Sequence, residues 1–93
     1  MNAKAKGSRA ERRAIRILEA AGYACTRAGG SFGLFDVVAV GPNDVRLIQV
    51  KAGGSHVSAF ERNQIQALPV PANVTREAWR FPDRCRAPLI ERW

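Results

Sequence analysis

Hydrophobic residues are concentrated in the middle of the chain, where residues 34–40 and 45–51 form two short, mostly apolar runs. The four residues between these runs, 41–44, are Gly, Pro, Asn and Asp, all of which favour turns. Apolar runs bounded in this way predict two strands joined as an antiparallel hairpin. The length of the connection places Val40 opposite Val45 in that hairpin.

Polar residues interrupt the hairpin at one end. Because side chains alternate between the two faces of a strand, counting back from the turn places Asp36 opposite Gln49, with Lys51 as a diagonal neighbour. Polar groups in an apolar setting cost free energy unless they are paired. A slip of one residue in register would turn Gln49 and Lys51 away from Asp36. The pattern therefore predicts that an acid, an amide and an amine converge at this end.

Before the hairpin, the apolar residues of 8–21 recur with the period of a helix. Ser8 and Glu11 form the S-x-x-E pattern of a capping box at its start, and Gly22 suits its end. The expected core face comprises the apolar residues of one arc: Ala10, Ala14, Ile17, Leu18 and Ala21. The opposite arc is basic: Arg9, Arg12, Arg13 and Arg16. Such a basic face suits either a solvated surface or contact with an anionic ligand.

Glu11 falls at the edge of the buried arc and away from the arginines. A capping role alone explains a carboxylate in the first turn of a helix. Its position at the edge of the core equally allows it to reach the polar end of the hairpin. Both interpretations stay open on the residues alone.

The remaining periodic segments complete an α/β domain. Strands are expected at residues 23–27, 75–81 and 88–93, and a second helix at 58–68. A glycine-rich loop at 28–33 leads into the hairpin and suits a turn or a close approach to a ligand. The order of helix, three strands, helix and two strands predicts a mixed central sheet of about five strands flanked by two helices.

The second helix begins with another capping box, formed by Ser58 and Glu61. Its apolar stripe is short and includes one amide: Phe60, Gln64, Ile65 and Leu68. An inward amide such as that of Gln64 is either a hydrogen-bonded core residue or part of a site.

Composition narrows the class of protein. A chain of 93 residues allows one domain, residues 1–93, with residues 1–7 as a basic arm. A net charge of +7 favours nucleic acid as partner over an anionic membrane. No apolar run approaches the length of about 20 residues that spans a membrane, and no secretory signal is recognisable. We expect a soluble protein of the cytoplasm, or of the host-cell cytoplasm if it is viral, with Cys25 and Cys85 reduced.

The polar residues form a set with a definite chemistry. Magnesium prefers oxygen ligands, and the chain offers four candidates: the carboxylates of Glu11 and Asp36, the Gln49 side-chain carbonyl and the Val50 backbone carbonyl. A metal so held polarises a phosphate and activates a water molecule. Lys51 can orient that water or stabilise charge on the phosphate. This set predicts phosphodiester hydrolysis with Mg²⁺, or Mn²⁺ in its place, and no small-molecule cofactor.

Asp36 followed by Gln49-Val50-Lys51 resembles the signature of the PD-(D/E)XK nucleases, in which an acid at a strand end precedes an acid-x-Lys motif. More specifically, residues 6–68 resemble the archaeal-type Holliday junction resolvases. The first-helix motif of that family carries a glutamate that completes the metal site, and Glu11 matches it. The resemblance implies a restriction-endonuclease-like core, cleavage of branched double-stranded DNA at four-way junctions, and a homodimer.

DNA contacts are expected from the charge of the chain and from the same resemblance. The expected DNA-binding residues are Lys6, Arg9, Arg13, Arg27, Ser31 and Gln64. Ser31 matches a loop serine near the active site of the family, and Gln64 matches a glutamine of the second helix. Phosphate contacts dominate such a set, so selectivity is expected to follow the shape of the junction and not its sequence.

Two residues depart from the family pattern: Phe35 stands where the pattern has proline, and Gln49 where it has an acid. The lost charge at position 49 predicts weaker metal affinity with activity retained. Two other functions stay open. One is a PD-(D/E)XK endonuclease of the repair or restriction type, which shares the same catalytic groups. The other is a DNA-junction-binding module that does not cleave, in which Gln49 marks a decayed site.

Overall fold

The computed structural model describes residues 3–28 and 33–93, with side chains from residue 7 onward. The described elements are α1 (Ala3–Ala20), β1 (Ala24–Arg27), β2 (Val37–Val40), β3 (Val45–Ala52), α2 (Ala59–Ala67), β4 (Val74–Phe81) and β5 (Leu89–Arg92). This order confirms the one expected from the sequence. Neither described helix combines the length and apolar character needed to cross a lipid bilayer.

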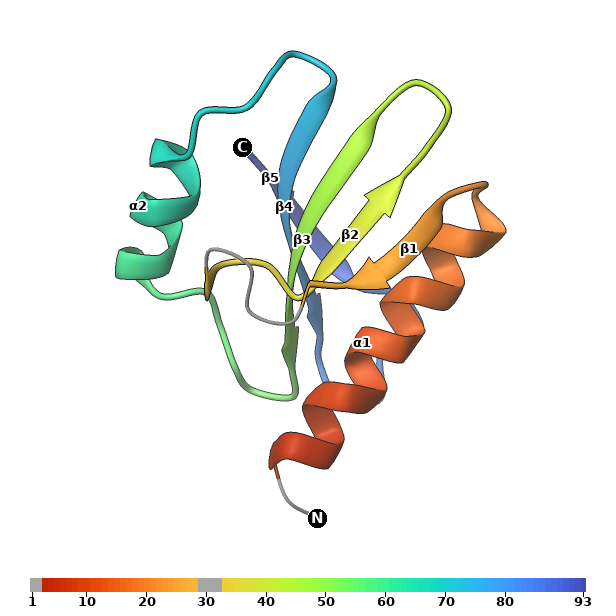
Figure 1. Ribbon diagram of the computed structural model, residues 1–93. Coiled ribbons are helices and arrows are strands. Elements are labelled where there is room, and N and C mark those ends of the chain that lie inside the picture. Colours follow the sequence, from red (N-terminus) through yellow and green to blue (C-terminus); the bar gives the residue numbers. More distant parts are fainter. Residues whose placement is uncertain (1–2, 29–32) are drawn as a thin grey trace.

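The five strands form a mixed sheet in the order β1-β2-β3-β4-β5 (Figure 1). Strands β3 and β4 are parallel, and the other neighbours are antiparallel. Parallel neighbours need a crossover connection, and the segment that contains α2 provides it. The two helices lie on opposite sides of the sheet, α1 against β1, β2 and β3 and α2 beyond the other face (Figure 1). The α/β class expected from the sequence is confirmed.

The central hairpin has the register that its turn predicts. Val40 pairs with Val45 and Val37 pairs with Ile48. Strand β2 begins three residues later than expected, and Asp36 just before it still contacts β3, because its N–H donates to the Ile48 carbonyl at 2.8 Å. Ile48 is the partner of Val37, so the ladder ends there and does not extend to the expected pair of Asp36 with Gln49.

Helix α1 packs on the sheet mainly through one row of residues, with the half-buried Ile15 beside it. The buried cluster comprises Ala10, Ala14 and Leu18 of α1 with Val37, Ala39, Ile48, Trp79 and Phe81 of the sheet. Residues four apart lie along one ridge of a helix, so Ile17 falls at the edge of this contact and is 39% exposed. Ala21 lies beyond the end of the helix and is exposed. The expected core face was therefore wrong at these two positions.

The start of α1 also differs from the prediction. The helix begins at Ala3, within the segment expected to be a basic arm, because alanine and lysine favour helix. Ser8 and Glu11 consequently lie inside the helix, and the predicted capping box is wrong. The Ser8 hydroxyl instead accepts a hydrogen bond from the Arg12 guanidinium at 3.2 Å.

A buried ion pair lies on the α1 side of the sheet. The Glu77 side chain is 0% exposed and accepts two hydrogen bonds from Arg46, at 2.8 and 2.7 Å. Thr75 and the Trp79 indole also donate to this carboxylate. Burial alone would raise the pKa of Glu77, but the bonds from Arg46, Thr75 and Trp79 outweigh it and lower the pKa to about 2. The network ties β3 to β4 beneath the helix.

Candidate active site

The Asp36 carboxylate lies where β2 begins, directly after the buried Phe35. Its Oδ2 accepts the backbone N–H of Val50 in β3 at 2.7 Å. Burial raises the pKa of Asp36, the Val50 N–H and the Lys51 charge lower it, and the Glu61 charge raises it again. The net direction is upward, which marks a carboxylate whose negative charge is incompletely balanced by its surroundings.

Gln49 is the central polar residue of β3 and is only 5% exposed. Its Nε2 donates to Oε2 of Glu61 at 2.8 Å. Its Oε1 is buried and has no hydrogen-bond partner among the described residues. A buried acceptor without a partner costs about 1–3 kcal/mol, so this oxygen suits a site that binds a cation or a donor.

Glu61 is the residue that the sequence did not assign to the site. The predicted capping box is confirmed, since Glu61 Oε1 accepts the Ser58 N–H at 3.0 Å and Ser58 Oγ accepts the Glu61 N–H at 3.0 Å. The other carboxylate oxygen, Oε2, accepts from both Gln49 and Lys51, the latter at 3.0 Å. The hydrogen bond from Ser58 is the largest cause that lowers the pKa of Glu61 to about 2, with Lys51 adding to it against burial.

Glu11 reaches the same region from α1. The side chain is half-buried, and its carboxylate lies 3.7 Å from the Arg27 guanidinium. Burial is the main cause that raises the pKa of Glu11, the charge of Asp36 raises it further, and Arg27 opposes both. Because the charge of Asp36 raises the pKa of Glu11, the two carboxylates interact electrostatically. Perturbed carboxylates of this kind cluster at functional sites.

The oxygen atoms of this cluster fit a hard divalent cation. No group of three or more His, Cys, Asp or Glu side chains lies close enough to hold a metal within the described part of the chain. The candidate ligands are two carboxylates, Glu11 and Asp36, with neutral oxygens from Gln49 and Val50. The N–H and C=O of one residue point to the same side of a strand, so the Val50 carbonyl projects toward Asp36 as its N–H does. An all-oxygen set suits magnesium, which retains several waters, and the unpaired Gln49 Oε1 supports the fit.

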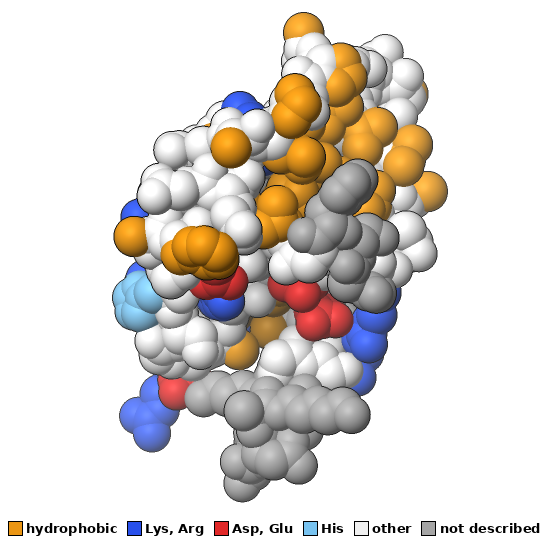
Figure 2. Space-filling view, turned by 60° about the vertical axis from the view of Figure 1, so that its left-hand side comes forward, with side chains coloured by type: hydrophobic (Ala, Val, Ile, Leu, Met, Phe, Trp, Pro, Cys, Tyr) orange, Lys and Arg blue, Asp and Glu red, His pale blue; other side chains and the backbone are white. Residues whose placement is uncertain are grey.

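The site lies on the side of the sheet that carries α2. Figure 2 shows acidic side chains on this side, below a region where hydrophobic side chains gather. Val40 is 49% exposed, and it shares its sheet face with the half-buried Val38, Val45 and Leu47. We call these four residues the apolar strip.

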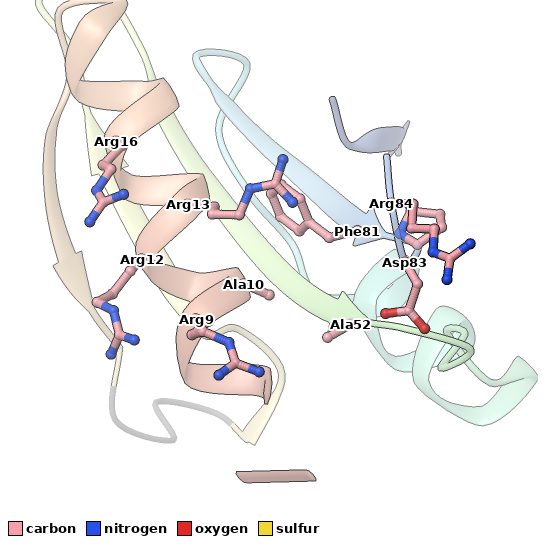
Figure 3. Close-up of a pocket in the computed structure, with 10 residues that line it drawn as sticks. Arg9, Ala10, Arg12, Arg13, Arg16, Ala52, Phe81, Asp83 and Arg84 are labelled. Carbon is pink, nitrogen blue, oxygen red and sulfur yellow. The ribbon is translucent and has the colours of Figure 1, made fainter. Parts of the chain in front are cut away.

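A basic groove lies on the other side of the sheet, between α1 and the segment that follows β4 (Figure 3). It encloses about 410 Å³ and is lined by Arg9, Ala10, Arg12, Arg13, Arg16, Ala52, Phe81, Pro82, Asp83 and Arg84. We call it the arginine groove. Four of its five arginines are those that the helical period placed together, and the fifth, Arg84, follows β4.

Arg13 has a structural role in this groove. Its guanidinium donates to the carbonyls of Cys85 and Arg86 at 3.2 and 3.0 Å. It also lies over the Phe81 ring, 4.9 Å from the ring centre (Figure 3). Arg13 therefore secures the segment after β4 to α1, and less of its hydrogen-bonding capacity remains for phosphate.

The other expected DNA-binding residues are dispersed. Arg27 ends β1, where its guanidinium donates to the Ser8 carbonyl at 3.3 Å. Gln64 is exposed on α2, so its predicted inward position is wrong. Lys6 lies within α1 with its side chain outside the described region, and Ser31 lies outside the described residues.

The exposed position of Gln64 follows from how α2 is attached. Ile65 is the buried residue of this helix, at 0% exposure, whereas Phe60 is 69% exposed. The C-terminal end is held by Arg76 of β4, which donates to the Leu68 carbonyl at 2.7 Å. With one buried apolar side chain and polar attachments that include the pair of Arg62 with Glu91, α2 leaves Phe60 and Gln64 in solvent.

Comparisons with known proteins agree on one family. The family model described as archaeal Holliday junction resolvase (Hjc) matches residues 2–79. The solved structure of Archaeoglobus fulgidus Hjc, a Holliday junction resolvase from an archaeal hyperthermophile, is similar with a TM-score of 0.71 at 24% sequence identity. The alignment covers 95% of this chain and 71% of that chain, which confirms the expected nuclease-like fold. A comparison with curated protein sequences gives no match.

Proposed function

Because the chain belongs to the archaeal Holliday junction resolvase family, we propose that the cluster around Asp36, Gln49 and Lys51 is its nuclease active site and that magnesium is its metal. The observation that carries this proposal is the buried, unpaired Oε1 of Gln49, the residue next to Val50, whose N–H holds the Asp36 carboxylate. We place this activity in one nuclease domain that acts in the cytoplasm, or in the host-cell cytoplasm for a viral chain.

The metal would be held by Glu11 and Asp36, together with Gln49 Oε1 and the Val50 carbonyl. Bound there, Mg²⁺ would polarise a phosphate and activate a water, and Mn²⁺ would accept the same oxygen ligands. The Val50 N–H keeps the Asp36 carboxylate fixed, since it donates to Oδ2 at 2.7 Å. The role of the chain is thus to present oxygen atoms already oriented for a cation.

Lys51 supplies the positive charge of the site. Its ammonium is held by Glu61 at 3.0 Å, and its charge lowers the pKa of Asp36. A fixed ammonium beside the scissile phosphate stabilises negative charge that develops in the transition state. We assign Lys51 to that step and not to binding of the DNA.

DNA is held by the basic surfaces. Arg9, Arg12 and Arg16 line the arginine groove, and each phosphate that they neutralise releases a counterion. We also propose DNA contacts, from the charge of the chain and the family resemblance, for Lys6, Arg27, Ser31 and Gln64. Because these residues contact phosphates and not bases, the protein would distinguish DNA substrates by the geometry of the four-way junction.

We also propose that two copies act together. A four-way junction has approximate two-fold symmetry, so a C₂ dimer presents one site to each of two opposed strands. The apolar strip supports this proposal, because an exposed apolar surface favours association, whereas the net charge of +7 opposes it elsewhere on the surface. Sedimentation of the wild type against Val40→Asp tests it: the dimer is expected to become a monomer in the variant.

The substrate class is tested by cleavage. A four-way junction, a linear duplex, a flap and a single strand of equal length are incubated with the protein and Mg²⁺. We expect paired nicks in the junction and little product from the other three. Equal cleavage of all duplex substrates would indicate a general PD-(D/E)XK endonuclease. Tight junction binding without product in Mg²⁺ or Mn²⁺ would indicate a non-cleaving module.

A further inference from the structure

The Glu61 carboxylate joins α2 to both polar residues of β3. Its Oε2 accepts Gln49 Nε2 at 2.8 Å and Lys51 Nζ at 3.0 Å. Its Oε1 accepts the Ser58 N–H at 3.0 Å. Both carboxylate oxygens are therefore engaged by donors of the chain itself, which separates Glu61 from the residues that would hold a metal directly.

These contacts determine which way the Gln49 amide points. An ionised carboxylate only accepts hydrogen bonds, so the amide must turn its NH₂ group toward Glu61. The carbonyl oxygen then points away from α2, where it is buried and has no partner among the described residues. If Glu61 were absent, the amide could rotate by half a turn and present its NH₂ group, which repels a cation.

Glu61 also restores a charge. The family pattern has an acid at position 49, and here that position is a neutral glutamine. The carboxylate of Glu61 lies within hydrogen-bond distance of the Gln49 amide, so a negative charge stays near the site although it comes from a different element. A charge a few ångströms from a cation still contributes attraction in a partly buried setting.

We propose that Glu61 is a positioning residue of the active site: it fixes Gln49 with its carbonyl oxygen toward the metal, holds Lys51, and supplies from α2 the charge that position 49 lacks. This inference rests on the proposed function. It assigns to the capping box a second role, which Ser58 does not share.

The affinity of the DNA-free protein for Mn²⁺, measured by calorimetry, tests the inference. Replacing a residue that orients a metal ligand typically costs about 10- to 100-fold in affinity, and we expect this loss for Glu61→Ala. Glu61→Gln retains an acceptor oxygen for Gln49, so its loss is smaller. Ser58→Ala is the matched control, because it removes the hydroxyl that accepts the Glu61 N–H and leaves the Gln49 contact, and it should bind Mn²⁺ like the wild type.

A second readout needs no metal. In NMR spectra of the apo protein, the side-chain NH₂ of Gln49 should carry the shift of a hydrogen bond to a carboxylate and lose it in Glu61→Ala. The NH₂ of exposed Gln64 serves as reference in both proteins. An unchanged Gln49 signal in Glu61→Ala would overturn the orientation that we infer.

The outcomes separate this inference from the proposed function. If the wild type cleaves junctions and Glu61→Ala binds Mn²⁺ equally well, the inference is wrong and the function stands. If Ser58→Ala loses as much Mn²⁺ affinity as Glu61→Ala, Glu61 acts only as a helix cap, and the inference is again wrong. A wild type that neither binds Mn²⁺ nor cleaves overturns the proposed function, and the inference with it.

Discussion

The backbone N–H of Val50 donates to the Asp36 carboxylate at 2.7 Å and joins the start of β2 to β3. The acid is thus fixed by the main chain and not by the neighbouring Lys51, whose ammonium is bonded to Glu61. Side chains of the site can consequently be replaced one at a time while the position of Asp36 is kept.

Lys51→Ala should keep junction binding and lose cleavage. Removing one donor that stabilises the transition state costs about 100- to 1,000-fold in rate, and Lys51 is not part of the arginine groove. Single-turnover cleavage measures the rate, and a gel-shift titration in Ca²⁺ measures binding. A loss of affinity that matches the loss of rate would contradict this division of roles.

Gln49→Glu should make the metal-free protein less stable. The substitution places a second carboxylate at the hydrogen-bond distance now occupied by the Gln49 amide and Glu61, and we expect a cost of about 1–3 kcal/mol in the free energy of unfolding. Adding Glu61→Gln should recover most of it, because the amide and the acid are then exchanged. Urea unfolding in EDTA of the two single variants and the double variant measures the coupling. Additive effects would mean that the two side chains do not interact.

The added charge in Gln49→Glu should nevertheless retain or raise the affinity for Mg²⁺. A carboxylate replaces a neutral oxygen in a site with two acids, Glu11 and Asp36, and attraction to the cation increases. Calorimetry measures the affinity. A collapse of both affinity and activity would mean that the site requires the neutral amide.

Acid should weaken the fold through Glu77. The pKa of its carboxyl falls from 4.5 to about 2 in the folded protein, so its contribution is complete above pH 4.5 and is lost as the pH falls toward 2. At 1.36 kcal/mol per pKa unit this amounts to roughly 3 kcal/mol. Glu77→Gln should therefore be less stable at pH 7, with a weaker dependence on pH below 5. Glu91→Gln, at the exposed pair with Arg62, is the control and should follow the wild type.

The arginine groove predicts a specific dependence on salt. Each phosphate contact that is removed lowers the slope of log affinity against log salt concentration by about 0.9, so Arg12→Ala and Arg16→Ala should each reduce it by up to that amount. Arg13→Ala should in addition lower the melting temperature, because it secures the segment after β4. Binding measured between 50 and 200 mM salt, a range in which such contacts are resolved, gives the slopes. Unchanged slopes would place the DNA elsewhere.

The central hairpin was predictable because its determinants are local. The alternation of side chains along each strand and a turn of fixed length determine the register. The predicted pairing of Val40 with Val45 is confirmed. The start of α1 was mispredicted for a local reason as well. The S-x-x-E pattern at Ser8 and Glu11 occurs inside a helix as readily as at its start, and the alanines and lysines before it extend the helix.

Glu61 could not be placed in the site from the sequence, because its role depends on how α2 docks. The capping box accounts fully for a carboxylate at this position, so no local anomaly marks it. The signal that was present is the short distance along the chain between Lys51 and the capping box, which brings the first turn of α2 back to the end of β3. The outward position of Gln64 has the same origin, since the helix wheel does not specify how few residues a short helix buries.

Cleavage of a four-way junction in Mg²⁺ by the wild type and by Asp36→Asn tests the proposed active site most directly. Asparagine keeps an acceptor for the Val50 N–H and removes the charge that would hold the metal. We predict paired nicks from the wild type, a loss of at least about 100-fold in the variant, and equal binding of the junction by both. Equal product from both proteins, formed without metal, would contradict the assignment of Asp36 and the metal-dependent mechanism with it.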